Sequence, residues 1–479
     1  MVQRKDLAGK TLLPSFMDSH SHLTALAQTM GLVNLRETTS ISEIVTKLEQ
    51  YRKKRNIPKG EWIVGFGYDH NFLAEKRHPN KIDLKDFTEN PILLAHVSGH
   101  MGVTNALGLE QMKIEKNTPN PEGGKIGKLS NGEVSGYLEE TAFYQYGASI
   151  LQWGEEKIIS CIEEAQQEYA KNGITTIQDG LIKPAEWKML QIASNRSALY
   201  LDVVGYVDYY HPEIVRKHPE YVKKYKNHLK IGGYKLLLDG SPQGKTAWMS
   251  APYEGEKEYK GYPVHTDQEV EEAVHQSVLE NNQLLTHCNG DNAAEQLIRA
   301  YEKEEKEKVK KTRPVMIHAQ TVRKDQLVRM KAINMLPSFF IAHTYYWGDI
   351  HQKNLGKRAE TISPAKTAEE LQLPYTFHQD TPVIDPNMLE TIWCSVNRKT
   401  KEGNVLGKGE CIGVYEALKA VTKNVAYQYF EEDTKGTIEE GKLADFVVLD
   451  KNPCKVEKDT IKEIKVVETI KEGKTIYRD

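Results

Sequence analysis

The sequence predicts an α/β protein, a (β/α)8 TIM-type barrel with a long insertion after its first strand and a small β-domain built from the ends of the chain. Two observations support this prediction. From about residue 155 onward, short apolar segments alternate with segments of helical periodicity, as expected of parallel strands joined by helical crossovers. Polar residues with charged or metal-binding side chains also stand at or near the ends of these apolar segments, where such barrels carry their chemistry.

The predicted elements follow one another in regular alternation. A first strand ends before His20. Residues 156–171 place apolar side chains at helical spacing, and Asn172-Gly173 ends this helix. Further along, Thr266 and Glu269 form a capping box that begins another helix. The remaining predicted strands are residues 174–177, 201–206, 234–238, 284–287, 315–318, 338–343 and 375–380.

Two stretches lie outside this alternation. Residues 60–150 are rich in Gly, Asn and Pro, and we interpret them as an insertion that forms a lid. Residues 436–450 predict a turn and a strong strand, and two shorter strand-like segments follow. We therefore expect a remnant of a small β-domain at 1–12, a barrel at 13–425 that includes the insertion, and the C-terminal part of the small β-domain at 426–479.

Composition narrows the possible functions. Charged residues make up 27% and the hydrophobic set 39%, which is ordinary for a soluble protein. The net charge of −3 gives no reason to expect nucleic acid or an anionic membrane surface as a partner. The sequence contains neither a membrane-length apolar stretch nor an apolar core typical of a signal peptide, so we expect a cytoplasmic protein. The five scattered cysteines form no CxxC pair, which argues against a thiolate zinc site.

His20 and His22 are the most informative residues of the chain. They follow an apolar run, and residues i and i+2 of a strand point to the same side. Two neutral imidazoles placed in this way can share one metal ion. A His-x-His pair alone is often only a surface pair. A metal site is favoured here because other polar residues occupy similar positions in or after apolar segments, namely Lys235, His287, His318 and Asp380.

Several motifs in the expected order together resemble the amidohydrolase superfamily of metal-dependent hydrolases. The closest similarity is to its amidohydrolase-3 branch, which includes N-substituted formamide deformylases, and it extends over nearly the whole chain. The motifs that carry the resemblance are the first-strand signature at 13–22, the insertion motifs at 67–69, 91–92 and 99–100, the fourth-strand motif at 234–241 and the closing β-domain motif at 440–445.

Two features depart from the family pattern. Few residues precede the first barrel strand, whereas the family usually has β-structure there that pairs with the C-terminal strands. We therefore expect that an N-terminal segment is missing. Gln379 stands before Asp380, where a small residue is common, and this change is expected to alter access to the site without removing the ligand.

The resemblance implies a set of metal ligands. His20 and His22 would bind the more buried metal, and His287 and His318 the second. Lys235 would be carboxylated and would bridge both metals, since an ammonium group cannot bind a metal and is costly in apolar surroundings. The alternative for Lys235 is a shifted pKa or an ion pair with Asp239. Asp380 would be both a ligand and the general base, and the cofactor would be one or two divalent ions, with zinc as the first choice.

Candidate substrate contacts come from the barrel and from the insertion. His343, predicted to end the seventh strand, would donate a hydrogen bond to the substrate or else pack beside the site. His100 and Asn105 would contact the substrate from the insertion. Tyr68 and Trp347 are candidate pocket walls, with structural packing as the alternative.

These features predict a metal-dependent hydrolase of a C–N bond in an amide, formamide or cyclic amide. One alternative is a hydrolase of esters, lactones or phosphoesters that uses the same site. The other is a metal-poor relative that binds a small molecule without turnover. A small-molecule substrate is the expected partner, and a homodimer is common among similar proteins.

Overall fold

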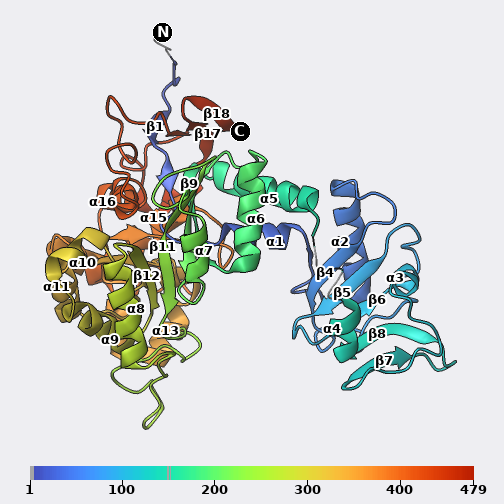
Figure 1. Cartoon of the computed structure of the whole chain (residues 1–479). Coiled ribbons are helices and arrows are strands. Elements are labelled where there is room, and N and C mark those ends of the chain that lie inside the picture. The colour runs from blue at the N-terminus through green and yellow to red at the C-terminus, as the bar shows by residue number, and fades with distance from the viewer. Residues whose placement is uncertain (1–4, 148–149, 151–152) are drawn as a thin grey trace. The chain divides into compact units, whose positions relative to one another are not determined.

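The computed structural model describes residues 5–147, 150 and 153–479. The chain forms two compact units, one comprising Met1–Leu26 and Ile162–Asp479 and the other Ala27–Cys161 (Figure 1). In the described part of the chain, no helix is long and apolar enough to cross a bilayer.

The first unit contains a sheet that, among the described residues, has eight strands, all paired in parallel and in chain order. The strands are β2 (Phe16–Met17), β9 (Ile174–Ile182), β10 (Asp202–Asp208), β11 (Leu229–Leu237), β12 (Gln283–Cys288), β13 (Val315–His318), β14 (Leu336–Phe339) and β15 (Thr376–Phe377). Helices connect successive strands, so the α/β barrel predicted from the alternation is confirmed.

The helices of this unit follow the strands along the chain. They are α1 (Leu23–Met30), which runs into the second unit, α5 (Glu155–Ala170), which runs back from it, α6 (Pro184–Asn195), α7 (Pro212–Lys217), α8 (Asp267–Leu279), α9 (Asp291–Glu302), α10 (Lys306–Thr312), α11 (Lys324–Ala332), α12 (His343–Tyr346), α13 (Gly348–Leu355), α14 (Ala365–Glu370), α15 (Met388–Asn397), α16 (Val414–Ala420) and α17 (Lys423–Gln428). Thr266 and Glu269 form the predicted capping box at the start of α8.

The first and last strands of the barrel meet just beyond their ends. The Asp380 N–H donates to the His20 carbonyl at 3.1 Å, and the His22 N–H donates to the Thr381 carbonyl at 2.8 Å. These hydrogen bonds bring the end of β15 beside the end of β2 and close the ring. They also place the segment that follows β2 next to the segment that follows β15.

The end of the seventh strand differs from the prediction. The apolar run 338–343 was expected to be a strand that ends at His343. Instead β14 ends at Phe339, and His343 is the first residue of the short helix α12. Periodicity alone cannot distinguish a buried strand from a buried helical turn in so short an apolar run.

A second sheet of the first unit, antiparallel in its described strands, joins the two ends of the chain. Its order is β1 (Thr11–Pro14), β16 (Phe446–Leu449), β17 (Val466–Lys471) and β18 (Lys474–Arg478). The Leu12-Leu13 run therefore belongs to this sheet, and only Phe16–Met17 enters the barrel. Pro14-Ser15 marks the break between the two segments, but their strand partners lie far along the chain, where no local pattern shows them.

The second unit has its own mixed sheet rather than a long irregular loop. Its described strands, in sheet order, are β3 (Val33–Asn34), β4 (Ile63–Tyr68), β5 (Ile92–His96), β6 (Met101–Thr104), β8 (Val134–Glu140) and β7 (Gly124–Lys128), with helices α2 (Ile41–Lys54), α3 (Ala106–Gln111) and α4 (Thr141–Gly147). In β5, Ile92 and Leu94 join one apolar cluster while Leu93 and Ala95 join another, so both faces of the sheet are covered. The unit starts at Ala27, well before the insertion expected at residue 60, and its role as a lid stays a prediction.

Candidate metal centre

The six predicted ligands gather at the carboxyl ends of the barrel strands. His20 and His22 follow β2, and Asp380 follows β15 across the closed edge of the ring. The other ligands are buried or half-buried residues at or near the ends of the neighbouring strands: Lys235 in β11, His287 in β12 and His318 in β13. This is the end of the barrel at which parallel α/β barrels bind their substrates.

His20 and His22 each place a ring nitrogen close to the carboxylate of Asp380. The His22 Nε2–Asp380 Oδ1 distance is 3.1 Å, and the His20 Nε2–Asp380 Oδ1 distance is 3.5 Å. Ligand atoms that lie 2.0–2.2 Å from a tetrahedral zinc ion are about 3.3–3.6 Å apart. Each of the two nitrogen–oxygen distances is therefore close to that between two ligands of one ion, and the donor atoms of His20, His318 and Asp380 all lie within 4.8 Å of one another.

His287 and His318 form a second pair of donors. His318 Nε2 lies 3.0 Å from His287 Nδ1, and His287 Nε2 lies 3.1 Å from the carbonyl oxygen of Gly240. An N–H donated from Nε2 to this carbonyl leaves Nδ1 of His287 deprotonated and able to bind a metal. Burial lowers the pKa of His287 to about 4, which keeps the imidazole neutral near pH 7.

Lys235 lies between the two groups of donors. Its Nζ is 3.1 Å from His20 Nε2, and the residue is 2% exposed. Burial lowers the pKa of Lys235 to about 7, although the negative charge of Asp380 acts in the opposite direction. Asp239 accepts hydrogen bonds from the backbone N–H groups of Trp248, Asn289 and Gly290, so its carboxylate is held by other partners.

His318 and Asp380 both have a left-handed backbone, with φ of 72° and 56° respectively. Non-glycine residues pay about 1–3 kcal/mol for such a conformation, and it persists only where the surroundings enforce it. Both residues are predicted ligands at strand ends. Left-handed backbone therefore occurs at two of the predicted ligands, as it does at other positions of the described chain.

His378 is a member of the site that the sequence analysis did not assign. Its Nε2 lies 3.1 Å from His318 Nδ1, and its Nδ1 lies 2.8 Å from Ser338 Oγ. Ser338 Oγ is 2.9 Å from Ser19 Oγ, which donates to the Phe377 carbonyl at 2.9 Å. If His318 binds a metal through Nε2, its Nδ1–H donates to His378 Nε2. The His378 Nδ1–H then donates to Ser338 Oγ, and the Ser338 hydroxyl donates to Ser19 Oγ. In that case His378 would position His318 and select its metal-binding tautomer.

We expect His378→Ala to weaken metal binding about 10- to 100-fold, the usual effect of removing a residue that orients a ligand. His378→Gln keeps an acceptor for His318 Nδ1–H and should lose less affinity. Zinc titration calorimetry of the full chain measures the effect, with His275→Ala, an exposed histidine of α8, as the control. Unchanged affinity in His378→Ala would show that His318 is oriented by other contacts.

A signal for His378 is present in the sequence. His378 precedes Asp380 by two residues, the same spacing that separates His20 from His22. The i, i+2 spacing that places His20 and His22 on one side of a strand applies equally to His378 and Asp380.

The predicted substrate contacts of the barrel lie together. His343 is buried, and its ring centroid is 4.5 Å from that of Trp347. Its Nδ1 lies 3.1 Å from His351 Nε2. Burial holds the pKa of His343 well below its usual value, so the side chain is a neutral hydrogen-bonding group.

The predicted contacts of the insertion belong to the second unit. Asn105 caps α3, accepts from the Ile92 and Gly108 N–H groups and donates to the Phe87 and Asn90 carbonyls. Its amide is fully used within the unit, so the expected substrate contact of Asn105 is replaced by a structural role. Tyr68 is buried and bonds to His78, whereas His100 is exposed and lies 3.0 Å from Glu140. The substrate contacts proposed for Tyr68 and His100 stay predictions.

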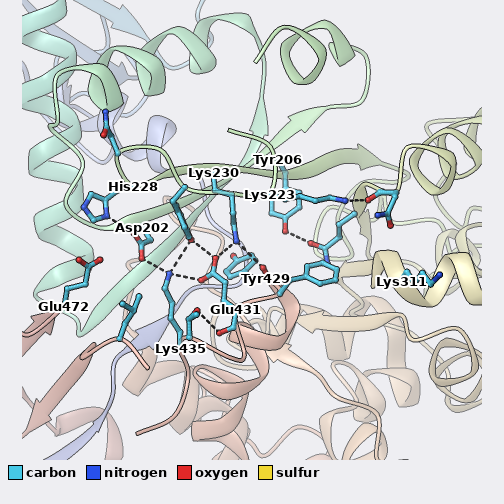
Figure 2. A pocket seen from close by; sticks show the side chains of 18 residues that line it. Asp202, Tyr206, Lys223, His228, Lys230, Lys311, Tyr429, Glu431, Lys435 and Glu472 are labelled. Carbon is cyan, nitrogen blue, oxygen red and sulfur yellow. Dashed lines mark hydrogen bonds and ion pairs between the residues drawn. The ribbon is translucent and has the colours of Figure 1, made fainter. Parts of the chain in front are cut away.

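A cavity of about 700 Å³ lies at the opposite end of the barrel, near the beginnings of β10, β11 and β12 (Figure 2). Its wall contains a network of buried charges. Lys435 Nζ lies 2.6 Å from Asp202 and 2.7 Å from Glu431, and Lys230 forms a further ion pair with Glu431. Because the amino ends of barrel strands serve stability, we assign this network to the fold and not to catalysis.

The fold agrees with the comparisons to known proteins. A model of the amidohydrolase family matches residues 4–477, so the chain belongs to the amidohydrolase family, as the motifs predicted. It is 26% identical over 497 residues to the putative amidohydrolase YtcJ of Bacillus subtilis (strain 168), covering 98% of this chain and 90% of that protein. It is also 26% identical over 490 residues to the N-substituted formamide deformylase of Arthrobacter pascens, covering 98% of this chain and 89% of that protein. An uncharacterized metal-dependent hydrolase from Pyrococcus furiosus has 26% identity and a TM-score of 0.72, with 94% of this chain and 89% of that chain covered.

Proposed function

We propose that this protein is a metal-dependent hydrolase that cleaves a C–N bond in an amide, formamide or cyclic amide. The observation that carries the proposal is the convergence of four imidazoles, a carboxylate and a lysine at the carboxyl end of the barrel. The similarity to a formamide deformylase and to a metal-dependent hydrolase supports it. The complete donor set argues against a metal-poor binding protein.

The donors suit two divalent ions, with zinc as the first choice because imidazole and carboxylate are its common ligands. His20, His22 and Asp380 would hold one ion, and His287 and His318 the other. Lys235, once carboxylated by CO₂, would supply an anionic oxygen to each. The lowered pKa of Lys235, about 7, supports carboxylation, because the reaction with CO₂ requires the neutral amine. When bound, the metals supply Lewis acidity and make hydroxide available near neutral pH.

Asp380 is the proposed general base. Burial alone would raise its pKa, but the hydrogen bond to His22 and the nearby His20 and His318 hold the pKa of Asp380 well below its usual value. The carboxylate is therefore ionised near neutral pH. It takes a proton from the attacking water and returns it to the leaving nitrogen. Neutral His343 would donate a hydrogen bond to the substrate, with Trp347 beside it.

A substrate panel tests the class of reaction. The zinc-loaded protein would be assayed with N-formyl amines, acyl amino acids, cyclic amides, lactones and aryl phosphates. Turnover of the C–N substrates in preference to the others is the expected result. Preferred hydrolysis of lactones or phosphates would replace the C–N assignment, since the walls of the pocket and not the ligands select the leaving group. No turnover of any compound by fully loaded protein would contradict hydrolysis itself.

Lys235→Ala should lower the zinc content of the barrel. Protein incubated with zinc and bicarbonate is expected to bind about two equivalents in the barrel, as in two-metal hydrolases, and the variant fewer because the bridge is lost. Elemental analysis measures this, with the surface substitution Lys245→Ala as the control. An unchanged zinc content in Lys235→Ala would show that the metals are held without the lysine.

A further inference from the structure

A second set of metal-type side chains lies in the second unit. Asp69 and His70 follow β4, and His96 ends the neighbouring parallel strand β5, in register with Tyr68. Adjacent parallel strands present their carboxyl ends at the same edge of a sheet, so the three side chains meet there (Figure 1 labels both strands). They are separated in the sequence from every residue of the barrel centre.

The three donor atoms have the spacing of a metal site. His70 Nδ1 lies 3.3 Å from His96 Nε2, Asp69 Oδ1 lies 3.5 Å from His96 Nε2, and Asp69 Oδ1 lies 3.8 Å from His70 Nδ1. Neighbouring ligands of tetrahedral zinc are about 3.3–3.6 Å apart. Small side-chain rotations bring all three atoms to that spacing around one ion.

Neighbouring groups hold these side chains in place. Asn71 donates to Asp69 Oδ1 from its backbone N–H at 2.9 Å and from its side-chain amide at 3.0 Å. The His78 ring stacks on His70 with centroids 3.9 Å apart, and His78 Nδ1 lies 3.0 Å from the Tyr68 hydroxyl. The rings and the carboxylate are thus oriented by contacts outside the donor set, as metal ligands are.

The protonation states also suit a metal. The hydrogen bond from the Asn71 backbone lowers the pKa of Asp69, and burial lowers the pKa of His96. A carboxylate and a neutral imidazole are the forms that bind metal. With a metal on Nε2, the His96 proton lies on Nδ1, 2.9 Å from Ser98 Oγ, which accepts it. The Ser98 backbone N–H, 3.1 Å from the same nitrogen, must then turn away.

We propose that Asp69, His70 and His96 form a second metal site, built from residues of the second unit alone, that binds Zn²⁺. Imidazole donors favour zinc and its transition-metal neighbours over Mg²⁺ and Ca²⁺, which prefer sets made of oxygen. Three protein ligands leave a fourth position of a tetrahedron for water or another small ligand. The ion would join the ends of β4 and β5 and so stabilise the second unit by binding its folded form.

Anomalous scattering at the zinc edge tests the site directly on crystals of the full chain grown with zinc chloride. The expected result is a peak within about 2.0–2.2 Å of Asp69 Oδ1, His70 Nδ1 and His96 Nε2. Crystals with zinc in the barrel and no peak between these three residues would overturn the proposal. A peak here with none in the barrel would instead contradict the proposed function alone.

Zinc titration in solution gives the second readout. The His70→Ala/His96→Ala variant should bind one equivalent fewer than the parent, or bind it about 100-fold more weakly, while the barrel equivalents remain. His211→Ala/His275→Ala removes two histidines outside both sites and serves as the matched control. The single variant His70→Asn covers the case in which the double variant does not fold. Equal stoichiometry and affinity in the parent and in both site variants would refute the site.

Discussion

Replacing Asp380 with asparagine is expected to lower kcat about 100- to 10,000-fold, the range lost when a general acid–base group is removed. The amide keeps the size of the side chain and tolerates the left-handed backbone at this position, with its φ of 56°. It removes the negative charge that faces His20 and His22. The defect should therefore lie in proton transfer and metal binding and not in folding.

Steady-state kinetics on the substrate found in the panel, together with zinc content, measures the effect of Asp380→Asn. Asp385→Asn, an exposed carboxylate five residues further along, is the matched control and should keep normal kinetics. Full hydrolysis by Asp380→Asn with normal zinc content would mean that another group takes the proton. His343 is the next residue to test in that case.

Lys435→Met is expected to lower the free energy of unfolding by about 3–5 kcal/mol, the cost of removing one partner from a buried ion pair. Lys435 is 4% exposed and lies 2.6 Å from Asp202 and 2.7 Å from Glu431. Methionine fills most of the volume but leaves two buried carboxylates with less positive charge. Lys471 and Lys230 still pair with them, which places the expected loss at the lower end of this range.

The loss should depend on pH. Burial raises the pKa of both carboxyls, but Lys435 and its neighbours outweigh burial and hold the pKa of Asp202 and of Glu431 below its usual value. Depressed carboxyl pKa values stabilise the fold above the unfolded pKa of about 4 and lose this contribution as the pH falls below it. The difference in the free energy of unfolding between Lys435→Met and the parent should therefore be larger at pH 7 than near pH 3.

Urea denaturation at several pH values checks this prediction. The exposed Lys423→Met, in α17, is the control and should unfold like the parent. A Lys435→Met protein as stable as the parent at pH 7 would show that Lys471 and Lys230 are sufficient to stabilise the buried carboxylates of Asp202 and Glu431.

Much of the barrel could be predicted because its apolar segments are discrete. Residues 315–318 were predicted as a strand and form β13 with the same ends. The strand expected at 375–380 is reduced to Thr376–Phe377, because the backbone has to turn at its carboxyl end to present His378 and Asp380. The predicted ligands each follow or interrupt an apolar run, and the structure brings them to the carboxyl ends of their strands, while their role as metal ligands stays a prediction.

The missed features depend on contacts between distant segments. The pairing of β1 with β16 brings residues 11–14 next to residues 446–449, and no local pattern encodes it. The network around Lys435 joins side chains that are more than two hundred residues apart in the sequence, such as Asp202 and Lys435. The sheet of the second unit was not predicted, because its strands are short, mixed in direction and separated by turns.

The edge at which the barrel closes has a consequence for its motion. His20, His22 and Asp380 contribute both donor atoms and the backbone hydrogen bonds that join β2 to β15. Both of these strands are two residues long, so this edge has the fewest ladder bonds to resist opening. An ion bound by these residues would hold the ends of the two strands together. Loss of the ion would allow the ring of strands to open locally, beginning at the proposed metal centre. If the proposed function holds, turnover and the closure of the barrel depend on the same few atoms.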